Sequence, residues 1–359
     1  MKKEVLLAHF PRITVKRYRD LVRTFSSLNA AWTANFDELT HLGWDHALVG
    51  EFLAWRDTID EKRITKILTQ EQIICITQDD DAYPPLLKEI YDPPFCLFVR
   101  GHIPEHSYNL AVVGTRKANS YGKQLVHDIV TPLVHQGITI VSGLALGIDA
   151  LAHNAALANN GTTIAVLGSG CNDRHIYPAA HRHLARRIVE NGGAVISEYP
   201  PGAMPSKFTF PRRNRIIAGM SLGTLVVQAG EKSGALITST CAMEVGRDVF
   251  AIPHPITMDV GAGPNKLLKE GAHLVTSPED IIETLDLKNI GIYATNKEII
   301  PDTPTEATLL NILTKEPTHI EVLIRESTLT SAEVTSTLTL MEMKGMVRNL
   351  GNMMYVRSR

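Results

Sequence analysis

The stretch from Lys207 to Arg215 holds the most concentrated chemistry of the sequence. It carries four positive side chains, no negative ones and two aromatic rings. Cations neutralise phosphates and aromatic faces accept unstacked bases, so this combination suits a single strand of nucleic acid held without sequence readout. Lys207, Phe210, Arg212 and Arg213 are therefore candidate binding residues. The opposing interpretation is that one of Phe208 and Phe210 belongs to the core, since burial is the commoner outcome for a single phenylalanine.

Four further loops place glycines and hydroxyl groups directly after short apolar runs. Followed by a helix, such a loop collects free backbone N–H groups that bind phosphate. Each is also compatible with an ordinary strand-to-helix turn. The candidate residues in these loops are Gly114, Thr115 and Arg116; Gly143 and Gly147; Gly168 and Ser169; and Gly230, Lys232, Ser233 and Gly234.

Two charged groups adjoin these loops and have two interpretations each. Asp149 and His153 are four residues apart and share a helix face. They form either an acid/base pair or a structural pair in which the carboxylate holds the histidine. The segment from Arg174 to Arg187 is rich in arginine and histidine, and it is either a second cationic surface or a solvated helix face.

The spacing of the loops predicts the elements that position them. From about residue 108 to 287, short β-branched runs alternate with helical stretches, which is typical of an α/β protein with an extended Rossmann-like, doubly wound parallel sheet. The carboxyl ends of such strands meet at one edge, so we expect Arg116 and Lys207 in one pocket. The expected strands are residues 110–113, 138–141, 163–167, 194–197, 224–227, 249–252 and 273–275.

Composition divides the chain into four segments. Residues 1–75 predict an N-terminal helical domain that contains all three tryptophans. Residues 76–290 predict the Rossmann-like DNA-binding domain, which begins with a proline-rich connector. Residues 291–304 are polar and predict a linker. Residues 305–359 predict a winged helix, with three helices and a two-stranded ribbon that turns at Gly351 and Asn352.

Several classes of function are disfavoured by what the sequence lacks. The four cysteines are widely spaced without a CxxC pair, which argues against a zinc or thiol-redox site and predicts a cytoplasmic protein. Residues 228–238 lack the GxxxxGK[ST] run of a P-loop, and we expect neither a signal peptide nor a membrane span. The net charge is −2, so a nucleic-acid site must come from local clustering. We expect no cofactor, no metal and no catalysis.

Six ordered blocks of the sequence together resemble the DprA/Smf family of bacterial DNA-processing proteins. The blocks are GTRKANSYG, SGLALGIDALAH, TIAVLGSGCN, SEYPPG, FPRRNRIIAG and VVQAGEKSGALITSTCAMEVGRDVFAIP, and the resemblance covers about residues 83–275. It implies a homodimer that binds and protects incoming single-stranded DNA and helps to load RecA recombinase during natural transformation. It also implies that Arg116 and Lys207 contact the DNA and that Phe210 stacks on a base. For the N-terminal helical domain it implies a SAM-like fold.

The C-terminal segment departs from what a DNA-reading domain needs. From Thr303 onward six positive and six negative residues cancel. The expected recognition helix, residues 331–343, carries two glutamates and no cation, whereas a groove-reading helix normally carries Lys or Arg. We therefore expect this winged helix to be an interaction module rather than a DNA reader.

Two other functions compete with DNA binding. The first is an enzyme, a Rossmann-type nucleotide phosphoribohydrolase, which shares glycine loops of this kind but requires a PGGxGTxxE run. Residues 228–234 read QAGEKSG instead. The second is an interaction scaffold with a vestigial sheet edge, since a fold does not dictate a function. The presence of Arg116, Lys207, Arg212 and Arg213 argues against this scaffold.

Overall fold

The computed structural model of the chain describes residues 1–105, 107–287, 303–313, 318–343, 346–349 and 353–357. The chain forms two compact units, Met1–Lys288 and Asn289–Arg359. Most of the predicted linker, residues 291–302, lies outside the described residues.

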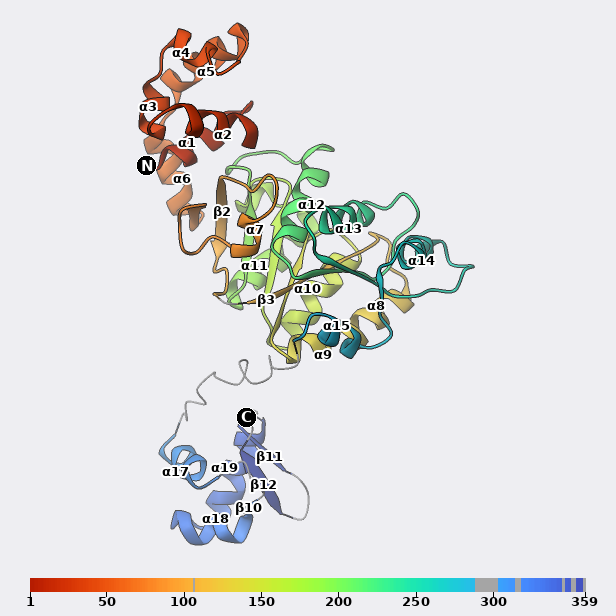
Figure 1. The fold of residues 1–359 in the computed structure, drawn as a ribbon. Helices are drawn as coiled ribbons and strands as arrows, with labels where there is room; N and C mark the ends of the chain where they lie inside the picture. The colour runs from red at the N-terminus through yellow and green to blue at the C-terminus, as the bar shows by residue number, and fades with distance from the viewer. Residues whose placement is uncertain (106, 288–302, 314–317, 344–345, 350–352, 358–359) are drawn as a thin grey trace. The chain divides into compact units, whose positions relative to one another are not determined.

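A mostly parallel sheet, with nine strands among the described residues, forms the centre of the first unit (Figure 1). Its strand order is β1-β2-β6-β5-β4-β3-β7-β8-β9, and the pairs from β6 to β9 are parallel. The strands are β1 (Ile73–Thr77), β2 (Cys96–Gly101), β3 (Tyr108–Val113), β4 (Ile138–Ser142), β5 (Thr163–Leu167), β6 (Ala194–Ser197), β7 (Gly223–Val226), β8 (Asp248–Ala251) and β9 (His273–Leu274).

The seven runs predicted from the sequence are the seven parallel strands, with ends that differ by at most two residues. In β4, β5 and β6 every residue is buried, as expected for strands covered on both faces. The predicted doubly wound α/β fold is therefore confirmed.

Strands β1 and β2 were not predicted, and they extend the sheet beyond β6. They pair antiparallel with each other, and β2 pairs antiparallel with β6. The prediction failed here because the two strands flank the proline-rich connector, which contains the single-turn helix α7 (Pro85–Lys88) in place of a glycine loop and a long helix. They therefore do not follow the strand–glycine–helix alternation that identified the others.

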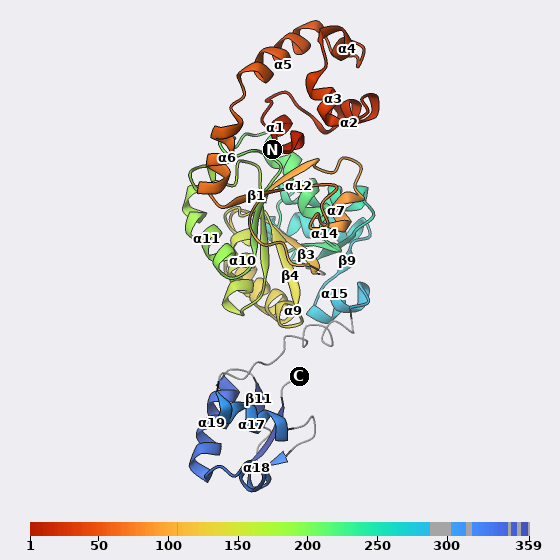
Figure 2. The ribbon, with the colours of Figure 1, turned by 90° about the vertical axis from the view of Figure 1, so that its left-hand side faces the viewer.

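Helices cover both faces of the sheet (Figure 2). In this view α10 and α11 lie on one side, and α7, α12 and α14 lie on the other. A π-helical turn, η1 (Val126–Val130), joins α8 to α9. The helices are α7 (Pro85–Lys88), α8 (Ser120–Leu125), α9 (Thr131–His135), α10 (Ile148–Ala158), α11 (Arg182–Glu190), α12 (Thr209–Gly219), α13 (Ala235–Glu244), α14 (Ala262–Lys269) and α15 (Pro278–Thr284), with 3-10 turns at η2 (Asp173–His175), η3 (Ala179–His181) and η4 (Asp259–Gly261).

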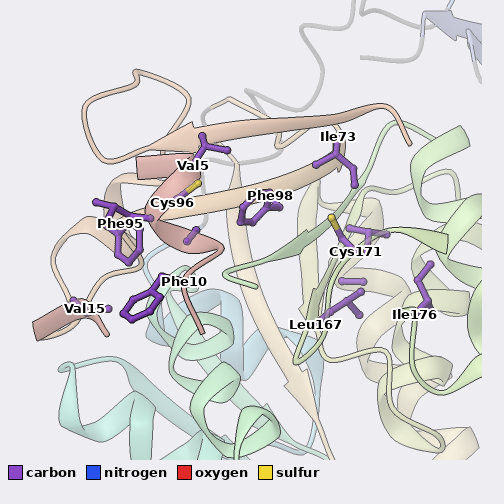
Figure 3. Close-up of a cluster of buried hydrophobic side chains, with 14 of the residues drawn as sticks. Val5, Phe10, Val15, Ile73, Phe95, Cys96, Phe98, Leu167, Cys171 and Ile176 are labelled. Carbon is purple, nitrogen blue, oxygen red and sulfur yellow. The ribbon is translucent and has the colours of Figure 1, made fainter. Parts of the chain in front are cut away.

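The N-terminal residues form the predicted helices, which pack on the sheet through a shared hydrophobic cluster (Figure 3). Phe10, in the turn between the first two helices, and Val15, at the start of the second, lie beside Phe95, and the cluster continues into the sheet through Phe98 and Leu167. The division at residues 75 and 76 stays a prediction, because both sides belong to one compact unit. The helices are α1 (Lys3–Ala8), α2 (Val15–Thr24), α3 (Leu28–Thr33), α4 (Phe36–Thr40), α5 (His46–Thr58) and α6 (Glu61–Gln70).

The second unit is a winged helix, which confirms the predicted fold of this segment. Its core is formed by Leu309, Leu323, Val334, Leu338 and Met341, all fully buried. A short strand, β10, joins the ribbon and was not predicted, while the predicted turn at residues 351–352 lies outside the described residues. The elements are α17 (Pro304–Ile312), β10 (Thr318–His319), α18 (Ile320–Ser327), α19 (Ser331–Met343), β11 (Val347–Asn349) and β12 (Met354–Arg357).

Across the described part of both units, the helices are too short or too polar to cross a membrane.

Candidate nucleic-acid interface

A pocket of about 590 Å³ opens at the carboxyl edge of the parallel strands. It collects residues from the loops after β3, β4 and β7 and from the first turns of α12 and α13. The predicted residues that line it are Gly114, Arg116, Lys207, Phe210, Arg213, Ser233 and Gly234. Arg116 and Lys207 thus meet in one pocket, as the topology of a doubly wound sheet requires.

Arg116 and Lys207 are the accessible cations of this pocket, and both are exposed. The Arg116 guanidinium lies 5.8 Å from the centre of the Phe210 ring. The Lys207 ammonium lies 5.1 Å from the ring of Phe208, which is 74% exposed. Among the residues that the structure describes, neither cation forms an ion pair. Both charges are therefore available to a phosphate.

Phe210 is half-buried and forms an aromatic wall of the pocket. Its ring packs on Tyr177 with centroids 5.5 Å apart, while Arg116 lies over it. Neither phenylalanine of the Lys207–Arg215 stretch is therefore a core residue, and the interpretation that one of them belongs to the core is wrong. Exposed or pocket-lining rings of this kind can stack on bases.

Arg213 lines the pocket from beneath and is only 5% exposed. Its Nη1 donates to the carbonyl of Gly143 at 2.8 Å and to the carbonyl of Val166. Burial lowers the pKa of Arg213 to about 10, and the nearby Asp149 carboxylate partly opposes this shift. Arg213 therefore links the carboxyl ends of β4 and β5, and its positive charge interacts with groups inside the fold.

Asp149 holds the loop after β4 rather than the histidine one turn further on. Its Oδ2 accepts from the backbone N–H of Gly143 at 3.1 Å and of Ala145 at 3.4 Å. Burial raises the pKa of Asp149, and Arg213 partly counteracts this effect. His153 instead bonds Thr163 through Nδ1 at 2.7 Å. Both the acid/base pairing and the structural pairing of Asp149 with His153 were therefore wrong.

Arg212 and Arg215 are paired by acids that lie outside their own sequence stretch. Arg215 Nη2 donates to Glu198 Oε2 at 2.5 Å, and its Nε lies 3.1 Å from Asp92 Oδ2. Arg212 Nε lies 3.7 Å from Glu198 Oε1. Arg212 lines a different pocket, on the other side of the first turn of α12.

The remaining predicted residues shape the edge without lining the pocket. Gly147 has φ +79°, and a Cβ there would lie 2.2 Å from the Thr115 carbonyl oxygen. Gly143 lies against the Arg213 guanidinium and Gly168 against Phe210. Ser169 is buried and donates to the His175 carbonyl at 2.8 Å. Thr115, Gly230 and Lys232 are near the rim but are not among the lining residues.

The basic Arg174–Arg187 segment is largely engaged within the fold. Arg186 forms a bidentate pair with Asp173, at 2.7 and 3.1 Å. Arg187 donates to the Asn154 side chain, and Arg182 to the Arg174 carbonyl. The interpretation as a solvated helix face fits these contacts better than a second cationic surface.

The sequence interpretation missed several lining residues, namely Asn214, Ile237 and Thr238. Ile237 is 41% exposed although it follows a buried strand by only one loop. The sequence did contain a signal for these residues. The first turn of a helix that follows a glycine loop at this edge faces the same space as the loop. Among the described residues, no cluster of three or more His, Cys, Asp or Glu side chains is arranged to hold a metal ion.

A doubly wound sheet whose carboxyl edge carries a pocket with two exposed cations and an aromatic ring defines a Rossmann-like protein. The family model of DNA recombination-mediator protein A matches residues 74–286, and that of the DprA winged helix domain matches residues 294–353. The chain belongs to the DprA/Smf family of DNA processing proteins and carries a DprA winged helix domain.

Individual relatives agree with this assignment. Protein Smf of Escherichia coli K12 is 48% identical over 219 residues, which are 61% of this chain and 58% of that protein. The structure of DNA processing protein A from Streptococcus pneumoniae matches with a TM-score of 0.67 and 35% identity, and covers 79% of this chain and 98% of its own. The Helicobacter pylori protein, described for a unique single-stranded DNA binding mode, matches with a TM-score of 0.53 and 28% identity, over 60% of this chain and 98% of its own.

Proposed function

We propose that this protein binds single-stranded DNA in the pocket at the carboxyl edge of its sheet. The observation that carries the proposal is the grouping of Arg116 and Lys207, both exposed, with Phe210 along one pocket wall. Two cations can neutralise neighbouring phosphates while the ring receives a base. The volume of about 590 Å³ lies within the range of small-ligand sites, roughly 300–1,000 Å³, and suits one or two nucleotides.

The remaining parts of the proposal rest on the family. We infer that the protein acts as a homodimer in the cytoplasm, protects incoming single strands and delivers them to RecA recombinase. The family name, a recombination mediator, supports this role. We infer also that the protein is not an enzyme, because Asp149, the acidic residue among those that line the pocket, accepts from two backbone N–H groups and lies near the Arg213 charge.

The test is a band-shift assay that compares single-stranded with duplex DNA across a salt series. We expect preference for the single strand and steep weakening with salt, because bound phosphates release counterions. Arg116→Ala and Lys207→Ala should each weaken binding about ten- to a hundred-fold, as expected for a lost charge-assisted bond of roughly 1.5–3 kcal/mol.

The double variant should depart from simple additivity, since both cations contact one ligand. Lys117→Ala is the matched control, because Lys117 is exposed beside Arg116 but does not line the pocket. Undiminished affinity in a well-folded double variant would place the DNA site elsewhere.

A further inference from the structure

A second pocket, of about 560 Å³, lies between the N-terminal helices and the loop that follows β6. Its walls are mainly apolar and aromatic, with a few polar side chains, which is the usual make-up of a site for a flat organic ligand. Phe10, Val15 and Phe95, grouped in Figure 3, form its base. Ile13 and Tyr199 are half-buried along its sides.

The two pockets share a wall, which is the first turn of α12. Thr209 and Arg212 line the second pocket, whereas Phe210, Pro211 and Arg213 line the first. The alternation follows from the helical repeat, because residues three apart face one side and those between them face the other. A strand held in the first pocket therefore reaches the second by crossing one helical turn.

The second pocket contains a buried hydrogen-bond acceptor that lacks a donor. The Glu198 side chain is only 7% exposed. Its Oε2 accepts from Arg215, but Oε1 has no hydrogen-bond partner among the described residues, and Arg212 Nε lies 3.7 Å away. Burial, then the Glu198 charge and last a side-chain hydrogen bond to Glu198 raise the pKa of the neighbouring Tyr199. A buried carboxylate oxygen without a donor costs free energy that a ligand N–H would recover.

We propose that the second pocket binds one base of the strand held in the first pocket, and that Glu198 Oε1 selects a base with an exocyclic amino group. The inference rests on the proposed single-strand binding. Cytosine and adenine present an amino donor, and carboxylates accept from cytosine N4, whereas thymine presents carbonyl oxygens at the corresponding edge. A phosphate next to this base would meet Arg212, which lines the second pocket and has a side chain that is 37% exposed.

The first experiment uses the native protein. The probes are oligothymidylates of one length in which a single cytosine occupies successive positions. We expect one position at which cytosine strengthens binding about tenfold over thymine, the gain for one hydrogen bond to a charged acceptor. Replacing that cytosine by N4,N4-dimethylcytosine should abolish the gain, because the modified base keeps its ring but has no amino donor.

Two variants test the residues. Glu198→Gln should keep the affinity for all-thymidine strands and lose the preference for cytosine. Because Glu198→Gln also removes the Arg215 ion pair, Ile13→Trp provides a second variant, which fills the pocket from its side without touching that pair. It should lose the same preference. Each variant is compared with the native protein by thermal melting.

The outcomes separate the two proposals. If native protein binds single strands through Arg116 and Lys207 but prefers cytosine at no position, the second base site is wrong and the first pocket stands. A preference that survives both folded variants would also overturn it. If native protein fails to bind single strands, the proposed function itself fails.

Discussion

Arg213 and Arg116 line one pocket, but substitution of Arg213 should destabilise the fold strongly and substitution of Arg116 should change its stability little. Arg213→Ala leaves the carbonyls of Gly143 and Val166 and the Asp149 carboxylate without their buried partner. We expect it to lower the free energy of unfolding by roughly 2–5 kcal/mol, measured by urea denaturation. Arg116→Ala removes an exposed side chain and should change stability by less than about 0.5 kcal/mol. Equal stability of the two variants would contradict the bracing role of Arg213.

His153 should make the fold sensitive to acid. The Thr163 hydroxyl donates to the Ile140 carbonyl at 2.7 Å, so His153 Nδ1 must donate to Thr163. His153 Nε2 is buried and has no hydrogen-bond partner among the described residues. Burial first, and then the nearby charges of His181 and Arg213, lower the pKa of His153 to about 3. Between pH 6.5 and about 3 the unfolded chain therefore holds a proton that the folded chain does not.

Stability should consequently fall as the pH drops below 6.5, by at most about 1.4 kcal/mol per pH unit from this group. His153→Gln keeps an N–H donor for Thr163 and cannot gain the charge. Urea midpoints between pH 7.5 and 5 should therefore decline less steeply in this variant than in the native protein. Parallel pH profiles would show that other groups control the acid response.

Two glycines at the carboxyl edge of the sheet differ in whether the backbone requires glycine. Gly147 opens α10 with φ +79°, and a Cβ there would lie 2.2 Å from a backbone oxygen. Gly147→Ala should cost roughly 1–3 kcal/mol from backbone strain alone. Gly234 precedes α13 with φ −60°, and a Cβ there meets no atom within 4 Å.

Gly234→Ala should therefore melt close to the native protein and yet weaken single-strand binding, because the new methyl group projects from a residue that lines the pocket. Thermal melting and band shifts on the same two preparations check both statements. A Gly234→Ala protein with native affinity would indicate that the strand does not approach α13.

Strands β3 to β7 were predictable because each is a largely buried apolar run followed by a loop that contains glycine, which is a local signal. Strands β1 and β2 are apolar runs too, but a proline-rich connector follows β1 in place of a glycine loop and a long helix, so the alternation did not identify them. The convergence of Arg116 and Lys207 followed from topology alone. The sequence could not indicate that Arg213 is buried while Arg212 faces another pocket, because neighbouring residues on a helix point about 100° apart and only packing decides which side is covered.

The winged helix should contribute little to the affinity of the whole protein for single-stranded DNA. It forms a compact unit of its own, and α19, its presumed recognition helix, contains Glu333 and Glu342 and no cation. Deleting residues 303–359 should therefore leave single-strand affinity within about threefold of the full chain, a change of less than 1 kcal/mol. Band shifts on both proteins measure this, with Lys207→Ala in the truncated chain as a control that must still lose affinity. A truncated protein that folds but no longer binds would assign the DNA site to the winged helix, against the charge balance of that segment.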